Sequence, residues 1–124
     1  MSTDFFKRSR FNNKKVTRRG RTYDSKAEAS YADTLLSMAR VGKIKEVREQ
    51  VRYPLPNMDG EMRMAYIADF VVINNSGEEF IIDVKGLLTP EMKVKLSYFQ
   101  YYYKKKVHLV FTTGAHAYRT EFLL

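Results

Sequence analysis

An acid and a lysine stand two residues apart inside the otherwise apolar run FIIDVKG, residues 80–86. Such a run is typical of a β-strand that lies against a core. Because side chains alternate between the two faces of a strand, Asp83 and Lys85 share one face with Ile81. A charge next to a core is costly unless it is paired or holds a cation. This strand therefore requires partner groups close by.

A second acid lies in the preceding apolar run, MAYIADFVVI, residues 64–73. Residues 74–77 (NNSG) follow it and predict a hairpin turn. If the last three form a loop with Gly77 in the left-handed conformation, Asp69 lies directly opposite Asp83, with Cβ atoms roughly 4.5 to 5.5 Å apart. A two-residue loop would shift the register by one and separate the acids.

Two carboxylates at this separation repel each other unless one is protonated or a cation lies between them. Mg²⁺ prefers carboxylate oxygens together with waters and substrate phosphate oxygens, which suits a site with few protein ligands. The pattern predicts Mg²⁺ at Asp69 and Asp83, with Mn²⁺ as a substitute and Lys85 beside the metal-bound water or the scissile phosphate. The alternative is an ordinary salt bridge between Asp83 and Lys85 on a partly exposed face.

Asp69 followed by Asp83-Val84-Lys85 resembles the motif of the PD-(D/E)XK nuclease superfamily, in which an acid precedes an acid-x-Lys strand across a hairpin. Ala68 stands where the motif's name has a proline, at a position without a chemical role. The resemblance covers residues 23–103 and is closest to small phage-type endonucleases, including junction-resolving enzymes. It implies a restriction-endonuclease-like core and a metal-dependent DNA endonuclease that acts on branched DNA such as Holliday junctions.

The resemblance also implies further site residues. Glu28 matches the glutamate that the superfamily carries on the preceding helix, and Glu28 and the Val84 carbonyl are implied as additional metal ligands. Lys95 is implied as a basic residue near the phosphate. Local spacing offers another interpretation of Glu28, because Ser25 and Glu28 match a capping box at a helix start.

The net charge of +8 is concentrated at the N-terminus, where residues 1–26 carry nine Lys or Arg against two Asp. We expect residues 1–20 to form a flexible basic arm and residues 21–124 to form the nuclease-like domain. Basic residues neutralise phosphates and release counterions, which favours a nucleic-acid partner over a merely solubilising tail. The basic residues predicted to bind DNA are Lys7, Arg8, Arg10, Lys14, Lys15, Arg18, Arg19 and Arg21.

The hydrophobic periodicity predicts an α/β fold in the order αβββαβ: a mixed sheet with an antiparallel meander, flanked by helices. The tail beyond residue 117 is apolar enough to dock on the core or on a second subunit. The predicted elements are a helix over Ser25–Val41, strands over Lys43–Tyr53, Met62–Ile73 and Glu79–Lys85, a helix over Thr89–Tyr103 and a strand over Lys106–Thr113.

The chain has no cysteine, which excludes disulfides, thiolate zinc sites and a cysteine nucleophile. With no long apolar run and no signal-peptide pattern, we expect a soluble cytoplasmic protein without a membrane partner, in a bacterial host cell if it is phage-encoded. Because one active site cuts one strand, we expect a homodimer. The alternatives are a non-catalytic nucleic-acid-binding protein on a degenerate nuclease fold, and an assembly protein.

Overall fold

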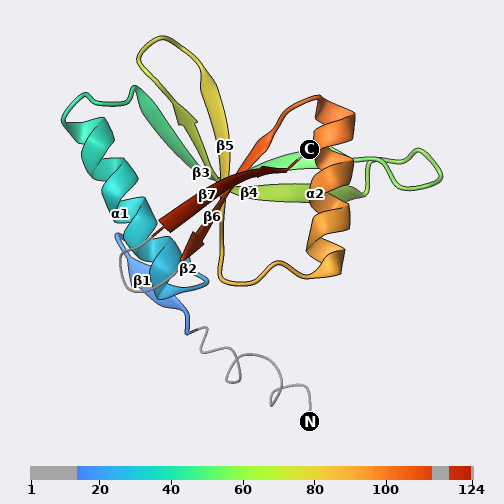
Figure 1. The fold of residues 1–124 in the computed structure, drawn as a ribbon, viewed down its shortest axis with the longest axis horizontal. Helices are drawn as coiled ribbons and strands as arrows, with labels where there is room; N and C mark the ends of the chain where they lie inside the picture. Colours follow the sequence, from blue (N-terminus) through green and yellow to red (C-terminus); the bar gives the residue numbers. More distant parts are fainter. Residues whose placement is uncertain (1–13, 113–117, 124) are drawn as a thin grey trace.

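The computed structural model describes residues 14–112 and 118–123. The predicted α/β core is confirmed, with a short hairpin before it and one further strand after it (Figure 1). In chain order the elements are β1 Val16–Arg18, β2 Arg21–Tyr23, α1 Lys26–Arg40, β3 Glu46–Leu55, β4 Met64–Ile73, β5 Glu79–Lys85, α2 Pro90–Tyr103, β6 Val107–Thr112 and β7 Tyr118–Leu123.

The main sheet has five strands in the order β3-β4-β5-β6-β7, and β1 and β2 form a separate two-stranded sheet. Among the described strands only β5 and β6 pair in parallel, because α2 crosses from the end of one to the start of the other. The C-terminal segment, which we expected to dock on the core or a second subunit, pairs antiparallel with β6 as the edge strand β7.

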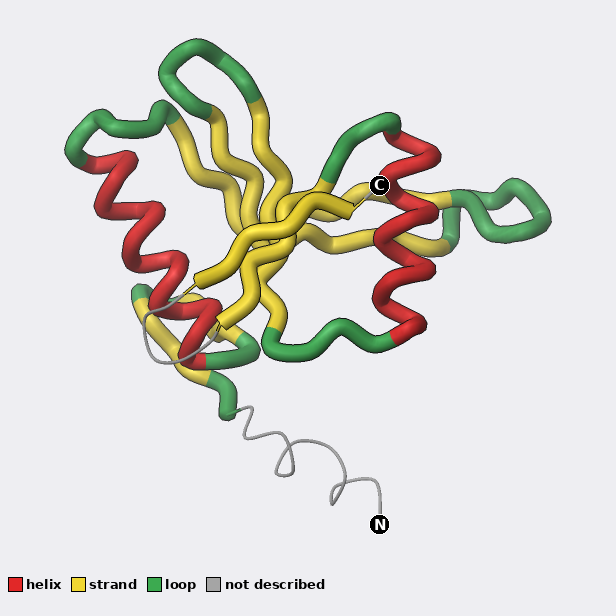
Figure 2. The backbone as a smooth tube through the Cα atoms, viewed as in Figure 1, coloured by secondary structure: helices red, strands yellow, loops and turns green. Residues whose placement is uncertain are grey.

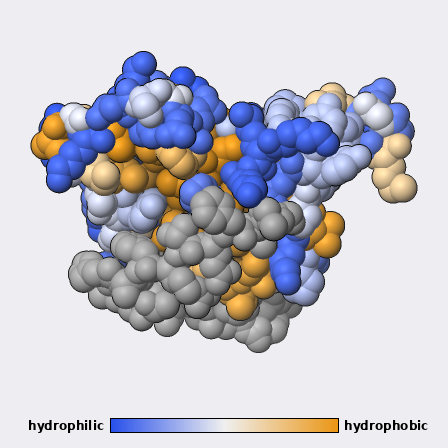
Figure 3. Space-filling view, turned by 45° about the horizontal axis from the view of Figure 1, so that its top comes forward, coloured by the Kyte–Doolittle hydropathy of each residue, from blue (hydrophilic) through white to orange (hydrophobic). Residues whose placement is uncertain are grey.

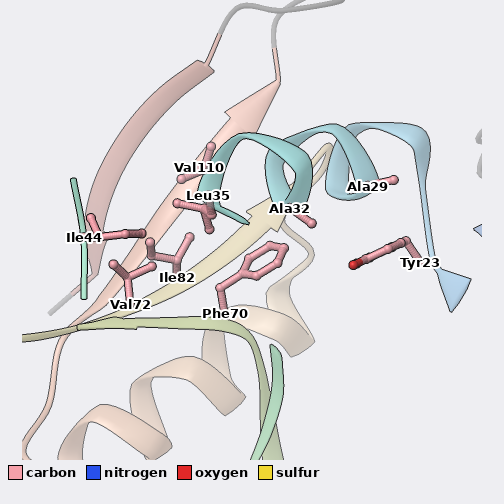
Figure 4. Close-up of a cluster of buried hydrophobic side chains, with 9 residues drawn as sticks. All are labelled: Tyr23, Ala29, Ala32, Leu35, Ile44, Phe70, Val72, Ile82 and Val110. Carbon is pink, nitrogen blue, oxygen red and sulfur yellow. The ribbon is translucent and has the colours of Figure 1, made fainter. Parts of the chain in front are cut away.

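The two helices cover opposite faces of the sheet. Beneath α1, the side chains of Phe70, Val72 and Ile82 form one buried cluster, and Figure 4 shows them directed toward the helix. Ile81, the neighbour of Ile82, packs in the second cluster with Leu96 of α2. Neither described helix is long and apolar enough to cross a membrane.

The helix boundaries follow from their capping residues. Ser25 caps α1 by accepting a hydrogen bond from the Glu28 backbone N–H at 3.1 Å. Thr89 caps α2 in the same way, accepting from Met92 at 3.2 Å, and Pro90 occupies the first turn, where its missing N–H costs no helical bond.

The predicted end of the first core strand at Tyr53 is wrong, because β3 continues through Pro54 to Leu55. A proline is tolerated here since β3 is an edge strand, with one side of its backbone unpaired. The loop that joins β3 to β4 projects beyond α2 (Figure 2). Figure 3 shows hydrophobic surface at the tip of this projection, where Met58 is fully exposed.

The β3–β4 pair changes faces halfway along its length. Val47 packs on the α1 side and Val51 on the α2 side, although their even spacing would put them on one face of a regular strand. Between them Gln50 has a φ of +54°, in the left-handed region. The regular alternation of side chains along β3 is therefore broken at Gln50.

The hairpin between β4 and β5 has the predicted three-residue loop. Gly77 has a φ of +94° and donates its N–H to the Asn74 carbonyl at 3.0 Å, and Asn74 donates to the Glu78 carbonyl at 2.9 Å. The ladder runs in the same register as far as the pair Phe70 and Ile82. The next pair in this register is Asp69 and Asp83.

Replacement of Gly77 by alanine should lower the free energy of unfolding by about 1–2 kcal/mol, because an L side chain is strained at positive φ. Gly86→Ala is the matched control, since Gly86 lacks a positive φ and an added Cβ there meets no atom within 4 Å. We expect it to be neutral or to stabilise by up to about 1 kcal/mol. Urea unfolding of both variants measures the difference, and equal losses would contradict the assigned loop geometry.

Candidate active site

The strands β4 and β5 separate at the predicted acidic pair. Beyond the last ladder pair, the Asp69 backbone N–H donates to Oδ1 of Asp83 at 3.4 Å, and the Val84 N–H donates to Oδ2 of Asp69 at 2.8 Å. Carboxylate oxygens thus replace backbone carbonyls as acceptors. From this point β4 bends away with β3 while β5 continues beside β6 (Figure 2). We call this place the fork.

Asp83 is the most deeply buried acid at the fork, with 2% of its surface exposed. Its Oδ2 atom accepts a hydrogen bond from the Tyr66 hydroxyl at 2.7 Å and lies 3.7 Å from Nζ of Lys85. Asp83 and Lys85 therefore form the ion pair that a shared face predicts. The acid itself, however, lies in the core rather than on a partly exposed face.

Glu28 reaches the fork from the first turn of α1 and is also buried. Its Oε1 atom accepts from the Asp24 N–H at 3.2 Å, and its Oε2 atom accepts from Nε2 of Gln50 at 3.0 Å. The Ser25 half of the capping box is present, but the Glu28 carboxyl group bonds to Asp24 and Gln50 and also interacts with Asp69. Glu28 thus takes part in the helix start and in the acidic cluster together.

Burial is the main cause of the raised pKa values at the fork. It raises the pKa of Asp69 to about 9, with further increases from the charges of Asp83 and Glu28. Burial likewise raises the pKa of Glu28, and it raises the pKa of Tyr66 together with the charge of Asp83. These shifts indicate that the cluster favours an added proton or cation.

Two adjoining hollows open beside the acids. The first has a volume of about 460 Å³, and its lining includes Glu28, Asp69, Val84 and Lys85. The second, of about 230 Å³, includes Asp83, Lys85 and Lys95 in its lining. Lys85 borders both, so the structure places the predicted acids, the Val84 position and both lysines around a concave region made of two hollows that share this residue.

Within residues 14–112 and 118–123, no three side chains of the His, Cys, Asp and Glu types form a ready-made ligand group for a metal ion. The donor chemistry nevertheless fits Mg²⁺. Carboxylate oxygens are its preferred protein ligands, and it needs only one or two of them when water and substrate supply the rest. Burial and the neighbouring charges of Asp83 and Glu28 raise the pKa of Asp69, so the site favours a proton or a cation beside it.

The described part of the basic arm is held against the domain by ion pairs. Arg18 and Arg19 both pair with Asp33 of α1, while Arg21 lies 3.7 Å from Glu49 and Lys15 lies 2.9 Å from Asp24. Residues 16–18 form β1, so regular structure begins before the expected boundary at residue 20. Lys14 is exposed. Lys7, Arg8 and Arg10 lie outside the described residues.

Two residues at the fork were not predicted. Tyr66 lies three positions before Asp69, and strand alternation would place it on the opposite face from that acid. It reaches Asp83 because β4 changes faces at the fork. Gln50 reaches Glu28 through its left-handed backbone, for which a glutamine gives no sequence signal.

Together these features define a small α/β protein with a mixed five-stranded sheet and a buried acidic cluster beside a lysine. The chain belongs to the DUF1064 family, described as a protein of unknown function, whose model matches residues 8–120. No curated protein and no solved structure matches the chain.

The raised pKa of Asp69 predicts that the stability of the fold depends on pH, which can be measured without a metal. Its pKa is about 9 in the folded protein against an ordinary value of 3.8, so between these values the folded state binds the extra proton. The free energy of unfolding should therefore fall as pH rises through this range. Asp69→Asn should reduce that fall by at least about 1.4 kcal/mol, the equivalent of one pKa unit.

Urea unfolding from pH 5 to pH 9 in EDTA measures this effect. Asp59→Asn is the control, because the Glu61 backbone amide and Arg63 hold the pKa of Asp59 below its ordinary value, so it stays ionised throughout. An unchanged pH slope in Asp69→Asn would show that Asp69 is not the group that titrates.

Proposed function

We propose that this chain is a Mg²⁺-dependent DNA endonuclease of the PD-(D/E)XK type, with branched DNA such as Holliday junctions as its substrate class. The arrangement at the fork supports the proposal. Asp69 and Asp83 interact across two strands, Glu28 joins them from a helix, and Lys85 lies 3.7 Å from Asp83. A structural salt bridge requires one acid, whereas three acids around one lysine leave a negative charge that suits a divalent cation.

The carboxylates of Glu28, Asp69 and Asp83, with the Val84 carbonyl, would hold Mg²⁺, and Mn²⁺ would substitute. Mg²⁺ bound there supplies the positive charge that polarises a phosphodiester for attack by water. The protein keeps the acids oriented through hydrogen bonds from the Tyr66 hydroxyl and from backbone amides. Such fixed donors reduce the rearrangement needed when substrate arrives.

Lys85 supplies a positive charge beside the acids. Its side chain borders both hollows, so its ammonium group can orient the attacking water or offset the charge that develops on the phosphate. Lys95 borders the second hollow from α2 and would hold the neighbouring phosphate of the same strand. The two lysines thus define a direction for the strand, from the acids toward α2.

DNA contact would extend to the basic arm, and the protein would act as a homodimer in the cytoplasm. A single fork cuts one strand, so resolution of a junction requires two copies. The basic residues in and next to the β1–β2 hairpin form ion pairs with acidic residues. Contacts from the arm would therefore come chiefly from Lys7, Arg8, Arg10 and Lys14.

A non-catalytic nucleic-acid-binding protein is the second candidate. The observation that favours it is that protein donors already contact the carboxylates of Asp69 and Asp83, and the described residues contain no ready-made metal group. In that case the chain would bind DNA equally in EDTA and in Mg²⁺ without cutting it. A DNA cleavage assay in Mg²⁺ therefore distinguishes the two functions.

Asp83→Asn should abolish cleavage of a four-way junction in Mg²⁺ or Mn²⁺, because it removes a charge that the cation requires. Lys85→Met should lower kcat by about 10²-fold or more, as expected for loss of a group that stabilises transition-state charge. Glu78→Gln is a matched control in the exposed hairpin turn and should cut normally. Labelled junctions separated on denaturing gels give the rates.

A second measurement tests cation binding apart from activity. Millimolar Mg²⁺ should raise the melting temperature of the wild-type protein and of Glu78→Gln but not that of Asp83→Asn, because a ligand that binds only the folded state stabilises it. Junction binding without cutting in every divalent cation, together with no Mg²⁺ effect on melting, would favour the non-catalytic protein.

Deletion of residues 1–13 should weaken DNA binding and reduce its salt dependence. The deletion removes Lys7, Arg8 and Arg10 but leaves β1 intact. For duplex DNA each lost phosphate contact lowers the slope of log K against log salt by about 0.9, so a reduction of up to about 2.7 is expected. Fluorescence anisotropy between 50 and 300 mM salt measures it, and an unchanged slope would remove the arm from the binding surface.

A further inference from the structure

A third hollow continues the concave region away from the acids. It has a volume of about 480 Å³ and lies between the start of β4 and the outer side of α2. Lys95 borders both this hollow and the second one, just as Lys85 joins the second to the first. The three hollows are therefore neighbours that share Lys85 and Lys95 as lining residues, between the acidic fork and α2.

The walls of the third hollow differ from those of the other two. Apolar side chains dominate, among them Met64 at 39% exposure and Val94 at 70%. The Tyr98 ring forms a further wall and is fixed in place, because its hydroxyl donates to the Pro56 carbonyl at 2.7 Å. Large apolar side chains exposed together in a hollow indicate a surface that binds something.

We propose that the third hollow binds an unpaired nucleobase of the strand whose phosphate lies at Lys95. This inference rests on the proposed function and specifies its substrate: a strand with an unstacked base next to the scissile phosphate, as at a junction or flap. Base faces are apolar and flat, so they suit a pocket of methionine, valine and a tyrosine ring.

Charge indicates which part of the nucleotide enters the hollow. Glu91 lines the hollow one helical turn before Lys95, so the hollow carries one charge of each sign. A phosphate inside would be repelled by the Glu91 carboxylate, whereas a neutral base would not. The backbone would therefore follow Lys85 and Lys95, and the base would turn into the apolar space. A second copy of this chain would be the competing occupant.

Abasic substitution tests the proposal. Once the cut position on a junction or flap substrate is mapped, each unpaired base beside it is replaced in turn by an abasic site. For the wild-type protein, one position should lower kcat/KM by about tenfold, the loss expected when one stacked base is removed.

The matched protein variants are Met64→Ala with Val94→Ala, Val94→Ala alone, and Val41→Ala as the control. Val41 is as exposed as Val94 but lies at the end of α1, away from the three hollows. The double variant should cut normal and abasic substrates at equal rates, and Val41→Ala should keep the tenfold difference. If no abasic position matters to the wild-type protein, or if the double variant keeps the difference, the proposal is wrong.

Two further results separate this inference from the proposed function. If no substrate is cut in Mg²⁺ or Mn²⁺, the endonuclease proposal fails, and a 2-aminopurine placed at each unpaired position in EDTA then tests base binding by its fluorescence. A change that the double variant abolishes supports the base site, and no change overturns it. If the double variant is monomeric by sedimentation where the wild type is dimeric, and the base dependence is unchanged, the hollow is a subunit contact instead.

Discussion

Three acids, Glu28 and Asp83 buried and Asp69 half-buried, meet beside one lysine at the place where β4 and β5 separate. The carboxylates of Asp69 and Asp83 link the diverging strands, because they accept hydrogen bonds from backbone amides. Elsewhere in the sheet backbone carbonyls accept these bonds. The same arrangement raises the pKa of Asp69 to about 9. The groups that end the ladder are therefore also the groups that favour an added proton or cation. The structure and the proposed chemistry depend on one local geometry.

The change of faces in the β3–β4 pair makes that geometry possible. α1 and α2 pack on opposite faces of the sheet, so in a regular sheet their side chains would not meet. At Gln50 and Asp69 the two strands exchange faces, and Glu28 from α1 then lies in the same cluster as Asp83, which faces the α2 side. This change of faces thus gives side chains from both layers access to one site.

The positive charge of the chain is divided between two uses. In the β1–β2 hairpin, arginines pair with Asp33 and Glu49 and hold the hairpin against α1 and β3. At the fork, Lys85 borders the acids directly, and Lys95 follows it along α2. The paired arginines are therefore less available to a polyanion than their number indicates. The lysines beside the acids have a more specific placement than the basic arm as a whole.

Local chemistry in the sequence determined the helix caps, the αβββαβ order and the register that sets Asp69 opposite Asp83. Each depends on residues near in the chain: Ser25 and Thr89 at helix starts, and Gly77, which tolerates a positive φ. Only the tertiary structure decided that β3 passes through Pro54 and that Tyr66 and Gln50 contact the acids. These features arise where strands distant in the sequence bend together. A side-chain pattern with a period of two does not show where that period breaks.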